Sequence, residues 1–291
     1  KRQIERILRV KFPEEHLSIE RTMGPGHATE IARRAVREAF DTIVVVGGDG
    51  TINEVVNGVI GTNVRIGIIP SGTANDLARH FRIPRKVDRA CDVILAGNIR
   101  PTDAIAVNGR YYITDGGIGL PRQSLSIAES IKRLGAVGRF LTLILGSKLY
   151  LLGLAAALPA YYKRSLPLRI RLPNKLLCID AISLILGNQP ILGKRFRVLP
   201  GAENNDGLMD IVIIEKNRSL RELLRTAAAT LNGSHVERTG VKMLRGENIR
   251  IEMPRPCSFF GDGEIMQKAS AFDVHVRYRA VNFLVPPGEV S

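Results

Sequence analysis

Two short loops rich in glycine, threonine and acidic residues carry the clearest chemical signal in the sequence. The first, Gly47–Thr51 (GGDGT), directly follows the apolar run 42–46, and the second, Pro70–Asp76 (PSGTAND), follows the apolar run 66–69. Glycine lets the backbone come close to phosphate oxygens, and the free N–H groups at a helix start bind anions. Both loops therefore predict phosphate binding.

Asp49 is the most informative residue of the first loop. A carboxylate beside a phosphate site repels the phosphate unless a cation lies between them, so we expect Asp49 to organise Mg²⁺. Thr51 and Thr73 can donate their hydroxyl groups to phosphate oxygens, and Asn75 can bind nucleotide. The simpler alternative is that each loop is a tight turn whose polar side chain caps the next helix. Two such loops at the ends of strands in one sheet favour a single nucleotide site between them.

The elements that must position these loops alternate between strand and helix. The β-branched run 42–46 is typical of a strand buried on both faces of a parallel sheet, and 66–69 repeats this character. The spacing of apolar residues predicts helices before and after these two strands, and a short strand is expected between the first two helices. The helices are expected at 1–12, 27–40, 52–59 and 75–81, and the short strand at 17–21.

The character of the sequence changes after about residue 102. Short alternating segments follow, separated by turns with Gly, Asn and Pro, which predicts a β-rich second domain. Two of these turns, Asn205–Gly207 and Asp262–Gly263, are plain hairpin signals. The expected strands are 104–107, 111–114, 168–172, 181–186, 209–214, 248–253 and 272–276.

Long stretches of the sequence resemble the diacylglycerol kinase catalytic family, which includes bacterial lipid kinases and sphingosine kinases. The resemblance rests on GGDGTINEVVNG (47–58) and GIIPSGTANDLAR (67–79). Asn205–Asp210 also resembles the family's NDG-leucine turn, and Gly261–Glu264 its late DGE motif. Together these motifs span roughly residues 22 to 278, so the resemblance covers most of the chain.

The resemblance implies an ATP- and Mg²⁺-dependent lipid kinase, with Asp262 as general base, Glu264 nearby and Asp49 organising the metal ion. Phosphoryl transfer to an alcohol needs these roles: a positioned triphosphate, Mg²⁺ and a carboxylate that accepts the hydroxyl proton. A structural cation is implied at Asp206, with the carbonyl groups of Glu203 and Leu208; the alternative is a turn without metal. The implied nucleotide contacts are Thr22, Gly47, Gly48, Asp49, Gly50, Thr51, Ile52, Asn53, Gly72, Thr73 and Asn75.

The expected fold is therefore α/β plus all-β. A Rossmann-like ATP-binding domain covers 1–102 with about 280–291, and a β-sandwich lipid-binding domain covers 103–279. The cleft between the two is the expected active site. The apolar segment 140–162 approaches the length of a membrane span, but Lys148, two glycines and a proline interrupt it. A buried or interfacial helix is the favoured interpretation.

Charge predicts the partners of the protein. Formal net charge is +14 with a pI of about 10.1, which attracts the chain to polyanions. Charge alone does not choose among nucleic acid, an anionic membrane and phosphorylated substrates, and no motif for nucleic acid is present. The family resemblance implies a membrane lipid substrate, and the positive charge suits peripheral contact with an anionic membrane, at the inner, cytoplasmic face. Three widely spaced cysteines indicate buried free thiols rather than disulfides or a metal site. A homodimer is possible on this sequence.

Two departures from the family keep other functions open. The opening strand and Asn-Pro loop of the family do not occur here, which fits a truncated start, and Asp115 stands where asparagine is usual. They motivate a non-catalytic module that binds ATP or lipid. An NAD kinase-like small-molecule kinase is the other alternative, because NAD kinases share the GGDGT loop; they are not expected to carry the GTAND, NDG and DGE segments.

Overall fold

The computed structural model describes residues 2–12, 17–119, 165–192, 196–216 and 219–288. These divide into two compact units, the first made of Lys1–Ala104 with Arg277–Ser291 and the second of Ile105–Val276. The segment 140–162, for which a buried or interfacial helix was expected, lies outside the described residues. Among the helices that are described, none combines the length and apolar character needed to cross a bilayer.

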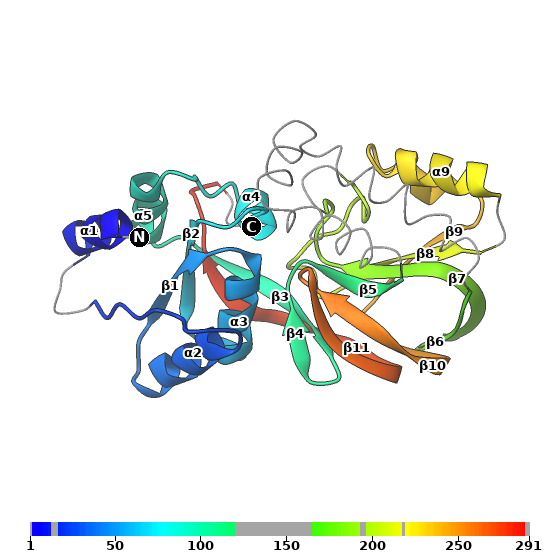
Figure 1. The fold of residues 1–291 in the computed structure, drawn as a ribbon, viewed down its shortest axis with the longest axis horizontal. Helices are drawn as coiled ribbons and strands as arrows, with labels where there is room; N and C mark the ends of the chain where they lie inside the picture. The colour runs from blue at the N-terminus through cyan, green and yellow to red at the C-terminus, as the bar shows by residue number, and fades with distance from the viewer. Residues whose placement is uncertain (1, 13–16, 120–164, 193–195, 217–218, 289–291) are drawn as a thin grey trace. The chain divides into compact units, whose positions relative to one another are not determined.

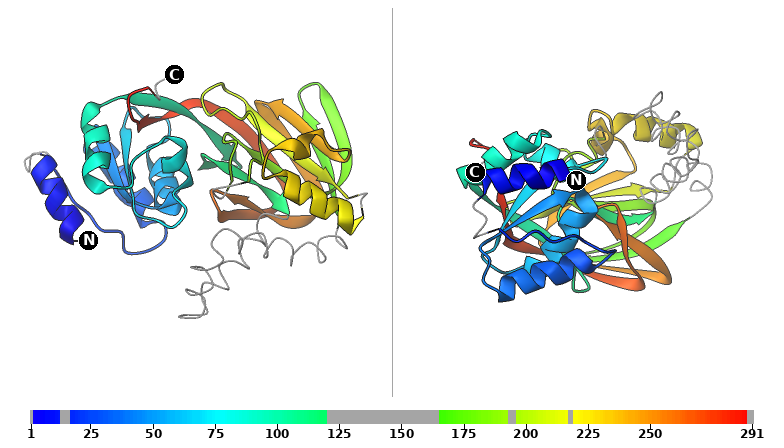
Figure 2. Two further views of the ribbon diagram at one scale, coloured as in Figure 1. Left: turned by 90° about the horizontal axis from the view of Figure 1, so that it is seen from above. Right: turned by 60° about the vertical axis from the view of Figure 1, so that its left-hand side comes forward.

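The first unit is a small parallel sheet covered by helices. β1 (Thr42–Gly47) pairs in parallel with β2 (Arg65–Pro70), and the end of β11 (Glu264–Leu284) pairs in parallel with β2. Helices α2 and α3 pack together on one side of this sheet, while α5 lies against β2 on the other side and contacts α1 (Figure 1; Figure 2). The helices are α1 (Arg2–Lys11), α2 (His27–Arg37), α3 (Asp49–Val59), α4 (Asp76–His80) and α5 (Val87–Ala96).

Small residues set the close packing of α2 on α3. Ala28 and Ala32 are the buried residues of α2, and a Cβ atom added to Gly58 of α3 would lie 2.5 Å from the Cβ of Ala32. Such a separation is far below van der Waals contact, so glycine is needed where the two helices meet. The apolar strand β2 supplies the core beneath them, with Ile66, Ile68 and Ile69 almost fully buried.

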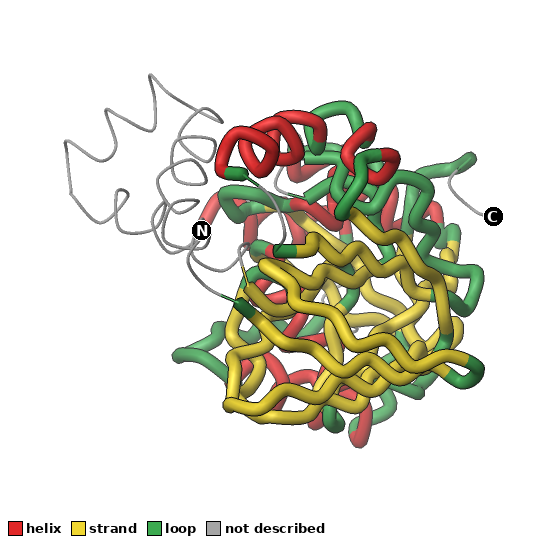
Figure 3. Tube along the Cα trace, turned by 90° about the vertical axis from the view of Figure 1, so that its right-hand side faces the viewer, coloured by secondary structure: helices red, strands yellow, loops and turns green. Residues whose placement is uncertain are grey.

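The second unit is built mainly from antiparallel strands (Figure 3). The path runs β11-β10-β5-β7-β8-β9, and β6 pairs with both β7 and β10, which brings distant parts of this path together. Its other described strands are β3 (Ile99–Val107, shared with the first unit), β4 (Arg110–Tyr112), β5 (Asp115–Gly119), β6 (Leu166–Leu172), β7 (Lys175–Gly187), β8 (Met209–Glu215), β9 (Val241–Gly246) and β10 (Asn248–Gly261). The helical elements described in this unit are α9 (Leu220–Ala229) and a 3₁₀ turn, Ser234–Glu237.

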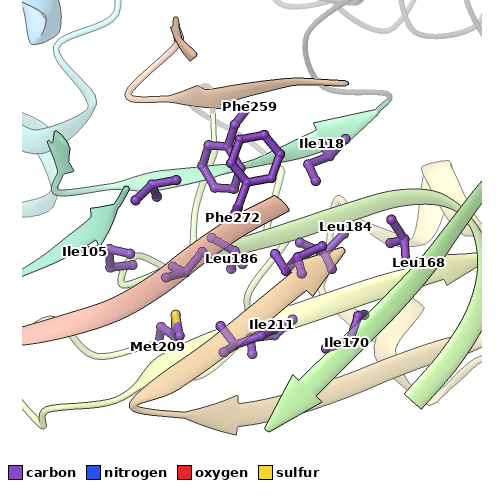
Figure 4. Packing of buried hydrophobic residues seen from close by; sticks show 14 of the residues in the cluster. Ile105, Ile118, Leu168, Ile170, Leu184, Leu186, Met209, Ile211, Phe259 and Phe272 are labelled. Carbon is purple, nitrogen blue, oxygen red and sulfur yellow. The ribbon is translucent and has the colours of Figure 1, made fainter. Parts of the chain in front are cut away.

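Alternating apolar side chains of these strands form one core. Figure 4 shows Phe259 and Phe272 packed against each other within it, with tilted rings whose centroids are 5.1 Å apart, among Leu184, Leu186 and Ile211. All five of these side chains are fully buried, which is the burial that period-2 patterning predicts for one face of a strand.

The expected mixed α/β first part and β-rich second part are confirmed, as are most of the expected elements. The expected strand at 17–21 is wrong: this segment has no partner strand, and Glu20 and Arg21 instead form ion pairs with Arg34 and Glu5. Helix 27–40 ends early, at Arg37. Of the cysteines expected to be buried, Cys91 is buried and Cys178 is exposed. Helices α5 and α9 and strands β5 and β9 were not anticipated.

Candidate nucleotide and phosphoryl-transfer site

The two glycine-containing loops lie side by side at the carboxyl ends of β1 and β2. Gly47 is in register with Pro70, and the amide of Ser71 donates a hydrogen bond of 2.9 Å to the carbonyl of Gly47. Only Gly48 separates β1 from the first residue of α3. The start of α3 is therefore held directly beside the second loop, as an anion site at a strand end requires.

The loops touch each other through their glycines. A Cβ atom built on Gly72 would lie 2.5 Å from the Cα of Gly48, and one built on Gly48 would lie 3.0 Å from the Cα of Gly72. A Cβ on Gly47 would meet the Cβ of Thr51 at 2.8 Å, so the threonine side chain folds back over the strand end. Glycine here serves loop-to-loop packing in addition to the predicted approach of phosphate.

Asp49 connects the two loops. Its Oδ1 atom accepts a hydrogen bond of 3.3 Å from the amide of Leu77, in the first turn of α4. Asp49 thus has the helix-capping role considered above, but it caps α4, which follows the second loop, rather than its own helix α3. A carboxylate at such a loop is a ligand that Mg²⁺ uses when substrate phosphates and water supply its other ligands. The residues present fit that group.

Other predicted contact residues have structural partners of their own. The side chain of Asn75 closes the second loop, because its Oδ1 accepts from the amide of Gly72 at 2.9 Å and its Nδ2 donates to the carbonyl of Gly72 at 2.8 Å. Ile52 is buried, and its amide donates to the carbonyl of Gly48. Asn53 accepts hydrogen bonds from Asn57, and Thr73 is exposed at the loop surface. Their contact with nucleotide stays a prediction.

Glu54 is a residue of this region that the sequence motifs did not single out. Its carboxylate accepts hydrogen bonds from the amides of Gly26 (2.8 Å) and Ala28 (3.0 Å), and its carbonyl accepts one from the hydroxyl of Thr29 (2.8 Å). These bonds cap α2 from the neighbouring helix α3. They also fix the segment that carries the exposed Thr22. The only signal in the sequence was a glutamate one turn after the first loop.

In the second unit, Asp262 lies at the tip of the hairpin between β10 and β11. Gly261 pairs with Glu264, so Asp262 and Gly263 are the two turn residues, and their φ angles of 50° and 80° are those of a type I′ turn. Glu264 begins β11 with an exposed side chain. The hairpin that Asp-Gly predicts is therefore present.

The carboxylate of Asp262 is held by the segment 113–114. Its Oδ1 accepts hydrogen bonds from the amide (2.8 Å) and hydroxyl (2.6 Å) of Thr114, and the amide of Ile113 lies 3.1 and 3.2 Å from the two carboxylate oxygens. The amide of Asp262 donates to the carbonyl of Asp115 at 2.9 Å. Asp115, which replaces the usual asparagine, thus supports the turn through its backbone.

Tyr112 is buried next to these acidic residues. Its hydroxyl donates to the carbonyl of Leu186 at 3.3 Å. Burial raises the pKa of the Tyr112 phenol well above its ordinary value, and the negative charges of Asp115 and Asp262 raise it further. Tyr112 therefore stays neutral and gives this region a hydrogen-bonded wall rather than a proton-transfer group.

The predicted cation-binding turn is also in the second unit. The amide of Leu208 donates to Oδ1 of Asp206 at 3.0 Å, and Arg245 donates from Nη2 to the other carboxylate oxygen. The Nε atom of Arg245 also lies 3.2 Å from Oδ1 of Asp210, a side chain that is 1% exposed. Burial raises the pKa of Asp210 to about 6, against the lowering effect of Arg245.

No group of three or more His, Cys, Asp and Glu side chains gathers into a metal site within the ranges that the structure describes. The set predicted at Asp206 uses one carboxylate and two carbonyl groups, and it stays a prediction.

Comparison with known proteins agrees with this arrangement. The diacylglycerol kinase catalytic domain matches residues 1–107, and the YegS C-terminal NAD kinase beta sandwich-like domain matches residues 136–285. Diacylglycerol kinase of Bacillus subtilis (strain 168) is 30% identical over 265 residues, which cover 90% of this chain and 83% of the relative. Diacylglycerol kinase of Staphylococcus aureus (strain Newman) is 30% identical over 84% of this chain and 75% of its own.

Solved structures show the same fold. A Bacillus anthracis crystal structure assigned as a diacylglycerol kinase has a TM-score of 0.77 at 22% identity and covers 98% of this chain and 91% of that one. An NAD kinase from Archaeoglobus fulgidus in complex with ATP has a TM-score of 0.54 at 12% identity, with 99% and 90% covered.

Proposed function

Because the chain belongs to the diacylglycerol kinase family, we propose that it transfers the γ-phosphate of ATP to the hydroxyl group of a diacylglycerol-like membrane lipid. The observation that carries this proposal is the pair of glycine loops whose backbones touch at the ends of β1 and β2. ATP as donor is supported by the NAD kinase of similar fold that was solved with ATP.

The first unit would hold the nucleotide. We propose that the backbone amides of Gly48–Thr51 and the hydroxyl groups of Thr51 and Thr73 donate to phosphate oxygens, with Thr22 as a further contact before the start of α2, which Glu54 caps. Asp49 would hold Mg²⁺. When bound, this ion neutralises charge on the β- and γ-phosphates. The hydrogen bond from Leu77 keeps Asp49 in place between the two loops.

The DGE turn would accept the proton of the lipid hydroxyl. Sequence reasoning gave this role to Asp262, with Glu264 nearby, but the carboxylate of Asp262 already accepts hydrogen bonds from Ile113 and Thr114. Most of these bonds converge on Oδ1, so the carboxylate has a clear role in holding the turn in place. We propose that Glu264, whose side chain is exposed at the start of β11, accepts the proton, and that Asp262 places the turn.

The lipid and its location follow from the family and from charge. Relatives named diacylglycerol kinase imply a lipid acceptor, and a net charge of +14 favours an anionic bilayer surface. ATP is a cytoplasmic substrate, so we place the reaction at the inner face of the membrane. We propose peripheral contact of the protein with that surface.

A phosphate-transfer assay tests the proposal. The full-length protein is incubated with Mg²⁺, ATP labelled in the γ-phosphate, and either mixed vesicles that contain diacylglycerol or a solution of NAD. We expect labelled phosphatidic acid, no labelled NAD, and loss of both Mg²⁺-dependent turnover and product in Asp49→Ala. Transfer to NAD, or to neither acceptor, would contradict the proposal in favour of an NAD kinase-like enzyme or a non-catalytic module.

A further inference from the structure

The turn 203–210 was expected to bind a structural cation. In the structure, an arginine side chain lies next to the acidic residues of this turn. Asp206 and Asp210 are four positions apart, and both direct carboxylate oxygens toward the same side chain, Arg245. Arg245 is on β9, in register with Asp210 across the β8–β9 ladder. A single guanidinium group therefore contacts both acidic residues, and the sheet fixes its position.

The ligands predicted for the cation are already engaged. In Asp206, one carboxylate oxygen accepts from the amide of Leu208 at 3.0 Å and the other from Nη2 of Arg245. With its amide nitrogen turned toward the carbonyl groups, Asn188 donates to the carbonyl of Leu208 at 3.2 Å and to that of Gly187 at 3.3 Å. Two of the three predicted ligands thus have protein partners.

A divalent ion and the guanidinium would compete for the same oxygen. Mg²⁺ needs oxygen ligands in near-octahedral geometry at about 2.0–2.1 Å. An ion bound to Oδ2 of Asp206 would therefore have to displace Arg245, which donates to that oxygen. Asp210, whose side chain is 1% exposed, would then lose the cation that lies 3.2 Å away. A buried carboxylate without a nearby cation is strongly unfavourable, whereas the guanidinium pairs with Asp206 and also lies 3.2 Å from Oδ1 of Asp210.

We propose that the guanidinium of Arg245 is the resident cation of this turn, in place of the divalent ion that the family resemblance implies. The residues present do not fit a metal ion there while Arg245 contacts Asp206 and Asp210. This proposal does not concern the Mg²⁺ proposed at Asp49, because Asp49 belongs to the first unit. The stability of the second unit should therefore not depend on divalent metal.

Metal content and thermal unfolding of the nucleotide-free protein test this directly. After dialysis without chelator, plasma mass spectrometry is expected to find no stoichiometric Mg²⁺ or Ca²⁺ in the wild type. Its Tm should change by no more than about 2 °C between EDTA and excess Mg²⁺. About one equivalent of retained metal that Asp206→Asn removes, or a clear fall of Tm in EDTA, would overturn the proposal. The metal content and the Tm of the wild type can be measured whether or not the kinase reaction occurs.

A pair of arginine variants provides the second test. Arg245→Gln should lower the Tm by roughly 10 °C, because it leaves Asp210 buried without a cation. The matched control is Arg250→Gln on β10: Arg250 is exposed to a similar extent and also binds two carboxylates, Glu252 and Asp273, but both of those are more exposed than Asp210. We expect the control to lose about 2 °C or less. Equal losses in the two variants would refute the assigned role of Arg245.

Discussion

The backbones of Gly48 and Gly72 touch: a Cβ atom on Gly72 would come to 2.5 Å from the Cα of Gly48. This contact joins the two loops that the sequence could only propose as partners. It requires glycine at position 72 and leaves little room for a side chain at position 48, where a Cβ atom would lie 3.0 Å from the Cα of Gly72.

Gly72→Ala should therefore separate the loops. The added methyl group meets backbone rather than a flexible side chain, so we expect a loss of about 1–3 kcal/mol in stability and a marked rise in the KM for ATP. Chemical denaturation and steady-state kinetics measure the two effects. Gly24→Ala is the matched control, because a Cβ atom at Gly24 has no neighbour within 4 Å. Equal behaviour of the two variants would show that the loop contact does not matter.

Glu54→Ala should loosen the start of α2. The change removes a carboxylate that accepts hydrogen bonds from the amides of Gly26 and Ala28, which is worth about 1–2 kcal/mol for a capping group. Urea denaturation measures the loss, and Glu30→Ala, an exposed glutamate of α2, controls for charge and helix propensity. If the Glu30 variant is destabilised as much, the cap is not the cause.

Glu264→Gln should affect mainly the rate of the reaction, whereas Asp262→Asn should also affect stability. Glu264→Gln is expected to lower kcat by roughly a hundredfold with little change in Tm, because it removes the proposed proton acceptor. Asp262→Asn should lower the Tm as well, since a neutral amide is a poorer acceptor for the donors at Ile113 and Thr114. Full activity in Glu264→Gln, with activity lost in a stable Asp262→Asn, would return the base role to Asp262.

Thr114→Val should affect the reaction through Asp262. It removes a hydroxyl that donates to the carboxylate at 2.6 Å, and Thr114→Ser keeps that donor. We expect kcat to fall about tenfold in the valine variant, with the KM for ATP unchanged and activity restored by serine. Equal rates for valine and serine would mean that the hydroxyl contributes nothing to the turn.

Asp210 should make stability depend on pH. Its folded pKa, about 6, lies above the ordinary value of 3.8, so its protonation favours the folded state at low pH and this contribution disappears as pH rises through about 6. Relative to Asp210→Asn, the wild type should lose about 1 kcal/mol of unfolding free energy between about pH 5 and about pH 7.5. Urea midpoints of both proteins at the two pH values measure this. A constant difference would contradict the raised pKa.

Sequence patterns predicted a strand or helix well where an apolar run and an adjacent glycine motif indicate the same element. The β-branched run 42–46 became β1, and the helix expected from residue 52 is present as α3, although it begins earlier, at Asp49. Helix α5 was not predicted, although Ala90, Cys91 and Ile94 form a buried face at helical spacing. The hydrogen bonds of Asp262 could not be anticipated, because their donors are some 148 residues away in the sequence. The contacts of Arg245 with the turn 203–210 could not be predicted either, because Arg245 and Asp206 are 39 residues apart in the sequence.

The bond between Thr114 and Asp262 also limits the order in which the second unit can form. Its partners are 148 residues apart, so the strands between them must be synthesised before the acidic hairpin can reach its anchor. Contacts between residues so distant in sequence form more slowly than local ones. The first unit has the same dependence, because β2 pairs with the end of β11. Neither unit can therefore complete its sheet from the amino-terminal part of the chain alone.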